Sequence, residues 1–189
     1  MKVMKNIVVI SATNRPGAYS LKLAIFIMAV LKKAGHQANL LDLAQLPADI
    51  FLNPVYYKQP DSFSLWQQAV NVSDAIIFCL PEYNGGIPGV LKYFLDMLSY
   101  PDSIKGKLVS MFGLSAGHSG AVNAMNSLTA LLQFQKAKVF TPNFSIPRCF
   151  EAIGESGEVT ALYRQLISDN LEIIISNLIK AESNQDNLG

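Results

Sequence analysis

Hydrophobic residues gather in short blocks along the chain, and polar or turn-forming residues separate these blocks. Four blocks, at residues 7–10, 37–43, 75–80 and 107–114, have the length and residue types of strands in a parallel sheet. A shorter block at 138–141 predicts a fifth strand. Residues 141–150 show no clear period, so we expect a loop there.

Between the strands, apolar residues recur at the spacing of amphipathic helices. A first helix is expected from Leu21 to a stop at Gly35, and a second at 65–72. A third would begin at Pro88, and a fourth would follow residues 115–121 and end at about Lys136. The apolar positions from Val159 to Ile174 predict a last helix. Residues 46–63 form a long, proline-rich connection in which Tyr56 and Tyr57 could cover a pocket or a partner subunit. The polar tail 181–189 is expected to fray.

Alternating strands and helices predict an α/β fold in which a parallel sheet is covered on both faces. Five strands fit a three-layer, doubly wound sheet of order 2-1-3-4-5. At 189 residues, the chain is expected to form a single domain spanning 1–189. In such a sheet the switch point lies between strands 1 and 3, and ligands bind at the carboxyl edge beside it.

Composition narrows the function classes. A net charge of +1 gives no reason to expect nucleic acid as a partner. No apolar run approaches the roughly 20 residues of a membrane span, and the N-terminus runs straight into the first strand without room for a signal peptide. Cys79 and Cys149 lie far apart in the sequence and fit no metal-binding spacing. We therefore expect a cytoplasmic protein that binds no membrane.

The loop after the first strand has the composition of an anion site. Ser11, Thr13, Arg15 and Ser20 lie within ten residues, and a helix begins directly after them. Hydroxyls, a guanidinium and the unpaired N–H groups of a helix end together favour a phosphate. A simpler interpretation is a polar turn with Ser20 as the helix N-cap. The loop alone leaves both interpretations open.

Two further loops reach the same edge of the predicted sheet. Residues 81–96 follow the third strand, and residues 115–121 follow the fourth. A phosphate after strand 1, with flat surfaces after strands 3 and 4, is the layout of an FMN site.

These loops resemble those of the NAD(P)H-dependent FMN reductases, a flavodoxin-like family that includes quinone, azo-dye and chromate reductases. Residues 11–20, S-A-T-N-R-P-G-A-Y-S, are similar to the family's phosphate loop. Residues 81–96, P-E-Y-N-G-G-I-P-G-V-L-K-Y-F-L-D, are similar to P-E-Y-N-x-[SG]-x-P-G-x-L-K-x-x-x-D and form the most specific match. Residues 115–120 match the family's S-x-G-x-x-G more weakly.

The resemblance implies FMN as cofactor and NAD(P)H as cosubstrate. Hydride would pass from NAD(P)H through FMN to a small acceptor, such as a quinone, an azo compound, a metal oxyanion or free flavin. Because the flavin carries this chemistry, no side chain is expected to be catalytic. A flavodoxin-like electron carrier and a flavin-binding protein without NAD(P)H activity are the alternatives. The family also implies a homodimer or homotetramer, for which the helix within 81–96 and the loop 51–63 are the expected surfaces.

The resemblance also implies roles for individual residues. Thr13, Arg15 and Ser20 would bind the phosphate, with Ser11 as a weaker candidate. The ring would lie along Pro81, Glu82, Tyr83 and Asn84 on one side and Ser115, Gly117 and His118 on the other. Each of three side chains has a second interpretation: Tyr83 could pack beneath the helix, Glu82 could pair at a helix end or subunit contact, and His118 could face water.

Two residues depart from the family pattern. Ala12 stands where glycine is usual, and Ala18 stands where serine is frequent. The missing hydroxyl at Ala18 would weaken phosphate binding by about 1.5–3 kcal/mol.

Overall fold

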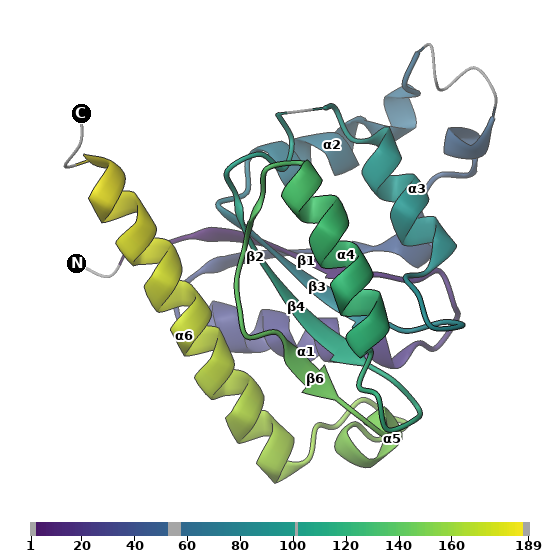
Figure 1. Ribbon diagram of the computed structural model, residues 1–189, viewed down its shortest axis with the longest axis vertical. Coiled ribbons are helices and arrows are strands. Elements are labelled where there is room, and N and C mark those ends of the chain that lie inside the picture. The colour runs from purple at the N-terminus through teal and green to yellow at the C-terminus, as the bar shows by residue number, and fades with distance from the viewer. Residues whose placement is uncertain (1–2, 53–57, 101, 187–189) are drawn as a thin grey trace.

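The computed structural model describes residues 3–52, 58–100 and 102–186, and it contains one central parallel sheet flanked by helices (Figure 1). The strands are β1 (Asn6–Ser11), β2 (Gln37–Asp42), β3 (Ala75–Pro81), β4 (Leu108–Leu114), β5 (Lys138–Val139) and β6 (Phe144–Ile146). Their order is β2-β1-β3-β4-β5, with β6 also paired to β4. The predicted order 2-1-3-4-5 is therefore confirmed.

Strand β6 corrects the prediction that residues 141–150 form a loop. β5 pairs only with the first half of β4, and β6 then pairs with its second half, matching Phe112 with Phe144 and Leu114 with Ile146. The rings of Phe112 and Phe144 lie 5.4 Å apart. The sequence Thr141-Pro142-Asn143 interrupts the apolar pattern between the two short strands, and this interruption hid β6.

The helices are α1 (Tyr19–Lys33), α2 (Ser64–Asn71), α3 (Gly89–Met97), α4 (Val122–Phe134), α5 (Cys149–Ala152) and α6 (Ala161–Asp186). Ala18, which makes no side-chain capping bond, is the N-cap of α1. Ser20 lies inside the first turn, so the interpretation of Ser20 as N-cap is wrong. Helix α6 continues to Asp186, beyond the apolar positions up to Ile174 that predicted it.

The connection 46–63 is less irregular than predicted. Short 3-10 helices occupy Ala48–Phe51 and Asp61–Phe63 within it, and another, Leu43–Gln45, precedes it. The ring of Phe51 packs on that of Tyr93 in α3, with centroids 4.7 Å apart. The 3-10 helix Ala48–Phe51 therefore lies against α3. Tyr56 and Tyr57 fall outside the described residues.

Side chains of β1 alternate between two cores. Val8 and Ile10 face a core that includes residues of α2, α3 and α4, whereas Ile7 and Val9 face a core built with α1 and α6. Both faces of the strand are therefore covered, as its unbroken apolar run requires. The same arrangement leaves the carboxyl ends of the strands as the edge where the loops after β1, β3 and β4 meet (Figure 1).

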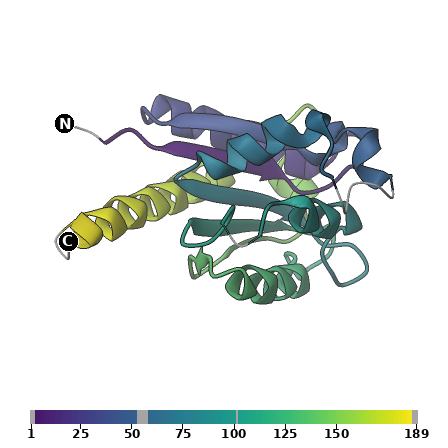
Figure 2. The same ribbon diagram turned by 90° about the horizontal axis from the view of Figure 1, so that it is seen from above.

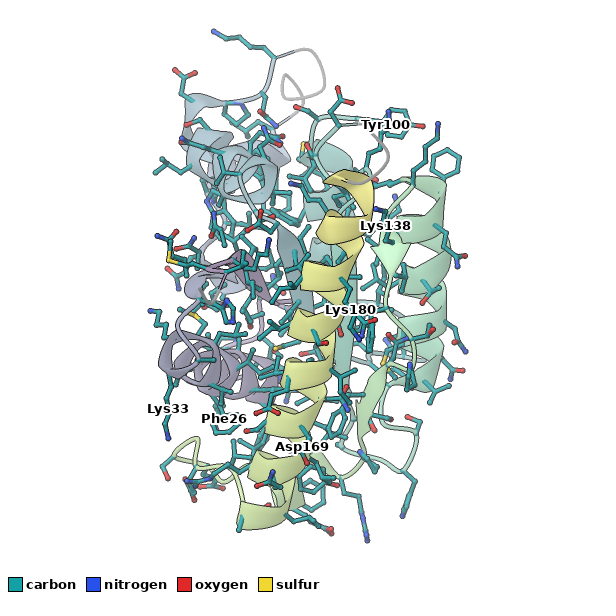
Figure 3. All side chains as sticks on the ribbon, turned by 90° about the vertical axis from the view of Figure 1, so that its left-hand side faces the viewer. Phe26, Lys33, Tyr100, Lys138, Asp169 and Lys180 are labelled. Atoms are coloured by element: carbon teal, nitrogen blue, oxygen red, sulfur yellow. The ribbon has the colours of Figure 1, made fainter. Side chains whose placement is uncertain are left out.

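Helix α6 packs along α1 and then continues past the sheet. Figure 2 shows its C-terminal part, in yellow, extending away from the rest of the fold. In Figure 3 α6 runs along this side of the molecule and carries Asp169 and Lys180, and α1, which carries Phe26 and Lys33, packs beside it. None of the helices within the described ranges has the length and hydropathy needed to cross a membrane.

Candidate active site

A cleft of about 360 Å³ opens at the carboxyl edge of the sheet. Its wall is formed by the loop after β1 and the start of α1, by the ends of β3 and β4 with the loops after them, and by α5. The lining residues are Arg15, Pro16, Gly17, Ala18, Tyr19, Ser20, Pro81, Glu82, Tyr83, Leu114, Ser115, Ala116, Cys149 and Phe150. This position beside β1 and β3 is the predicted switch point of the sheet.

The first wall of the cleft is the loop that enters α1. The N–H groups in the first turn of a helix have no acceptor within that helix, and the helix dipole adds positive potential. The exposed side chain of Arg15 lies on the same loop. Together these groups form a region that can bind an anion. Ser20 also lines the cleft, although its side chain is almost fully buried.

Ser11 and Thr13 lie behind this wall rather than in it. Both side chains are fully buried. The hydroxyl oxygen of Ser11 lies 3.4 Å from that of Ser20. Thr13 Oγ1 accepts the backbone N–H of Arg15 at 3.2 Å and donates to the Tyr83 hydroxyl at 3.1 Å. Their hydroxyls therefore brace neighbouring groups of the protein.

The second wall begins after β3 with a hairpin that has a two-residue turn. Tyr83 and Gly86 exchange both backbone hydrogen bonds at 3.0 Å, and the intervening Asn84 and Gly85 have φ values of 51° and 74°. Two consecutive positive φ angles identify a type I′ turn, which favours the sequence Asn-Gly. Tyr83 thus lines the cleft, while Asn84 is exposed at the tip and lies outside its lining.

Glu82 is held at the start of α4. Its Oε2 accepts the backbone N–H of Ala124 at 3.1 Å, and its Oε1 accepts the Ser119 hydroxyl at 3.2 Å. The helix-end interpretation of Glu82 thus describes a contact within this chain. A carboxylate there satisfies a free N–H group and complements the helix dipole.

The third wall is the loop after β4, with Ser115 at its centre. Ser115 Oγ accepts the backbone N–H of Gly120 at 2.8 Å and donates to the carbonyl of Gly117 at 2.9 Å. The backbone N–H groups of Arg148 and Cys149 bond the carbonyls of Gly117 and Ser115. Ser115 lines the cleft, whereas Gly117 and His118 are exposed and lie outside its lining.

Two cleft residues, Cys149 and Phe150, come from a segment that the sequence analysis did not assign to the site. Both come from α5, which follows the unpredicted strand β6. The side chain of Phe150 is 51% exposed, so an aromatic face is open beside the cleft. Burial raises the pKa of the Cys149 thiol, which keeps it protonated at neutral pH. A hint was available in the sequence, because Ile146, Cys149 and Phe150 are apolar residues at the end of the supposed loop.

Comparison with known proteins agrees with this geometry. The family model for NADPH-dependent FMN reductase matches residues 5–151, which include all three loops. An NAD(P)H-dependent FMN reductase of Pseudomonas aeruginosa is 30% identical over 128 residues, covering 66% of this chain and 68% of the relative. An NADPH azoreductase of a Bacillus species is 27% identical over 122 residues, covering 65% and 68%.

Solved structures support the fold. The flavoenzyme FerB of Paracoccus denitrificans, an NAD(P)H:acceptor oxidoreductase, superposes with a TM-score of 0.78 at 23% identity, covering 94% of this chain and 98% of FerB. The flavodoxin-like fold is thereby confirmed, and the family model confirms the family resemblance. This chain belongs to the NADPH-dependent FMN reductase family and is an FMN-dependent oxidoreductase that uses NAD(P)H as cosubstrate.

Proposed function

We propose that the cleft binds FMN with its phosphate at the N-terminus of α1 and its ring between the loops after β3 and β4. In this proposal the chain transfers hydride from NAD(P)H through FMN to a small electron acceptor. The observation that carries the proposal is the convergence of an anion-binding helix end and two further loops in one cleft.

The chemistry of the cleft fits FMN. The Arg15 guanidinium and the first N–H groups of α1 suit a phosphate dianion. Next to them, an ideal Cβ built on Gly17 would meet no atom within 4 Å, so a ligand can approach the backbone there. The cleft volume of about 360 Å³ also falls among small-molecule sites, which span roughly 300–1,000 Å³.

The two alanine departures differ in their consequences. The Ala12 side chain is fully buried in the core and lies outside the cleft lining, so its methyl group leaves the cleft unchanged. Ala18 lines the cleft and offers no hydroxyl. Any loss of phosphate affinity is therefore expected at Ala18.

Binding and orientation are the tasks of the protein. When bound, FMN supplies the redox chemistry by accepting hydride at N5 and returning it to the acceptor. The Arg15 loop would fix the phosphate, and the backbone of 81–84 would meet the polar edge of the ring. Ser115 would hold the loop 115–118 against the other side, where Gly117 and His118 would lie at the open edge.

Anaerobic titration of the FMN-loaded protein with NADH and with NADPH tests the proposal. We expect the oxidised flavin absorbance to bleach with at least one of them and to return when a quinone, an azo dye, a metal oxyanion or free flavin is added. Flavin that stays oxidised in the presence of both cosubstrates would support an electron carrier and contradict the proposal.

We also propose that residues 1–189 act as one domain in a cytoplasmic homodimer or homotetramer. Cys79 and Cys149 both have free thiols, which suits a reducing compartment. Phe51 extends the surface of α3. A second cleft of about 260 Å³ lies between α3 and α4, where the exposed rings of Tyr100 and Phe134 stack. Sedimentation equilibrium would test this assembly, and a monomer at micromolar concentration would contradict it.

A further inference from the structure

Two hydroxyl groups from different loops meet at the wall of the cleft. The Thr13 hydroxyl donates to the Tyr83 hydroxyl oxygen at 3.1 Å, and the same Thr13 oxygen accepts the backbone N–H of Arg15 at 3.2 Å. A hydroxyl group has one proton to donate. Because Thr13 gives that proton to Tyr83 and its side chain is fully buried, Thr13 has no proton left for a ligand.

Tyr83 is placed differently, because it is partly exposed and lines the cleft. Its oxygen accepts the Thr13 proton, which leaves the phenolic proton of Tyr83 for another acceptor. Within residues 3–52, 58–100 and 102–186, no hydrogen bond from this hydroxyl to another protein group is present. The free donor therefore belongs to the surface of the cleft.

The Tyr83 hydroxyl also lies at the anion-binding end of the cleft. It is separated from the Arg15 backbone N–H only by the Thr13 hydroxyl. Three groups thus form a directed chain, from the Arg15 N–H to Thr13 and from Thr13 to Tyr83. Each bond in such a chain polarises the next, which makes the last hydroxyl a better donor.

We infer that the Tyr83 hydroxyl donates to the phosphate of FMN and that Thr13 is the positioning residue that directs it. This inference rests on the proposed function and changes two roles within it. Thr13 acts through Tyr83 instead of touching the phosphate, and the Tyr83 side chain reaches the phosphate instead of the ring. Tyr83 thereby supplies a hydroxyl to the cleft that Ala18, the helix N-cap without one, also lines.

Affinities for FMN and for riboflavin, which lacks the phosphate, test the inference. Each affinity is measured from the quenching of flavin fluorescence as the flavin binds to the apoprotein. Tyr83→Phe is expected to weaken FMN binding about 10- to 100-fold, as for loss of a hydrogen bond to a charged group, and to leave riboflavin binding unchanged. Tyr100→Phe makes the same chemical change far from the cleft and is expected to alter neither affinity.

Thr13 variants separate a positioning role from direct contact. Thr13→Val, which keeps the shape of the buried side chain, is expected to weaken FMN binding but not riboflavin binding. Thr13→Ser, which keeps the hydroxyl, is expected to bind FMN with an affinity close to that of the wild type. In the double variant Thr13→Val/Tyr83→Phe, the second change should add little, because both act through one hydrogen bond to the phosphate. Additive losses would show that Thr13 acts independently of Tyr83, by direct contact with the phosphate or through the Arg15 N–H, and would overturn its role in directing Tyr83.

Two other outcomes are decisive. Equal weakening of FMN and riboflavin binding in Tyr83→Phe would place the hydroxyl at the ring or ribityl chain and overturn the inference while leaving the proposed function intact. A wild-type protein that binds neither flavin would overturn the proposed function and the inference with it.

Discussion

Glu82 and Ala124 join two elements of the candidate active site: the carboxylate after β3 accepts the N–H of Ala124 in the first turn of α4 at 3.1 Å. The other carboxylate oxygen accepts the hydroxyl of Ser119 on the loop after β4. One side chain therefore fixes the relative positions of two loops that line the cleft. This contact gives Glu82 a structural role that requires no proton transfer.

Replacing Glu82 should change stability more than chemistry. Glu82→Ala removes the acceptor at the start of α4 and should lower the free energy of unfolding by about 1–2 kcal/mol. Glu82→Gln keeps an acceptor oxygen and should lose less of the free energy of unfolding. Urea unfolding would measure both values, and kcat at saturating FMN should remain near wild type. A fall in kcat of a hundredfold or more in Glu82→Gln would instead indicate a catalytic carboxylate.

Two glycines of one loop offer a matched pair. Gly120 has φ +56°, and an ideal Cβ there would lie 1.9 Å from Ser145 Oγ, whereas a Cβ on Gly117 would meet nothing within 4 Å. Gly120→Ala should therefore destabilise the protein by roughly 1–3 kcal/mol through strain and displacement of Ser145. Gly117→Ala should have a thermal midpoint close to that of the wild type. Equal thermal midpoints for the two variants would contradict the loop geometry described above.

Ala18→Ser should restore a hydroxyl at the N-cap of α1. A serine at this position can accept an N–H of the first helical turn, which should add about 0.5–2 kcal/mol to the stability of the apoprotein. It can also donate to the phosphate, so FMN affinity should rise about 10- to 100-fold while riboflavin affinity stays constant. Flavin titration of both proteins checks this expectation. Unchanged FMN affinity would place the phosphate away from Ala18.

The two thiols should react slowly in the folded protein. Burial raises the pKa of both Cys79 and Cys149, and the reactive species is the thiolate. A raised pKa lowers the thiolate fraction at a given pH, so alkylation should be slow at neutral pH and accelerate as the pH rises. Cys149 lines the cleft and should react before the fully buried Cys79.

Peptide mass spectrometry after iodoacetamide treatment would resolve the two sites. Bound FMN should slow alkylation of Cys149 further by covering the cleft. Alkylation of Cys149 at neutral pH as fast as in the unfolded chain would contradict the burial described here.

The fold could be predicted from the sequence because its strongest patterns are local. The apolar run at 7–10 belongs to a strand covered on both faces, and the first helical pattern belongs to a helix packed beneath it. Strand β6 was missed because three residues are too few to establish a period. Its existence depends on pairing with β4, which is a tertiary interaction.

The candidate site could be predicted only in part, because it too depends on tertiary interactions. Arg15, Tyr83 and Ser115 line the cleft as the motifs indicated. Asn84 belongs to the same motif, but it forms the tip of a tight turn and lies outside the cleft lining. A motif identifies a loop, whereas the hydrogen bonds within that loop decide which of its side chains face the ligand.

The roles of buried hydroxyls and of distant segments lay beyond the sequence. A serine or threonine in a phosphate loop has the same chemistry whether it faces the ligand or braces a neighbour. The contacts with Tyr83 and with the Arg15 N–H show that the Thr13 hydroxyl is bonded within the protein. Phe150 reaches the cleft through β6 and α5, whose placement no local pattern predicts.

The central claim is that this cleft holds FMN, and the visible spectrum of the purified protein tests it most directly. The spectrum is recorded before and after incubation with FMN and desalting, for the wild type and for Arg15→Ala. We predict that the wild type retains oxidised flavin bands in about equimolar amount and that Arg15→Ala retains much less. A wild-type protein that stays colourless after incubation with FMN would contradict the claim.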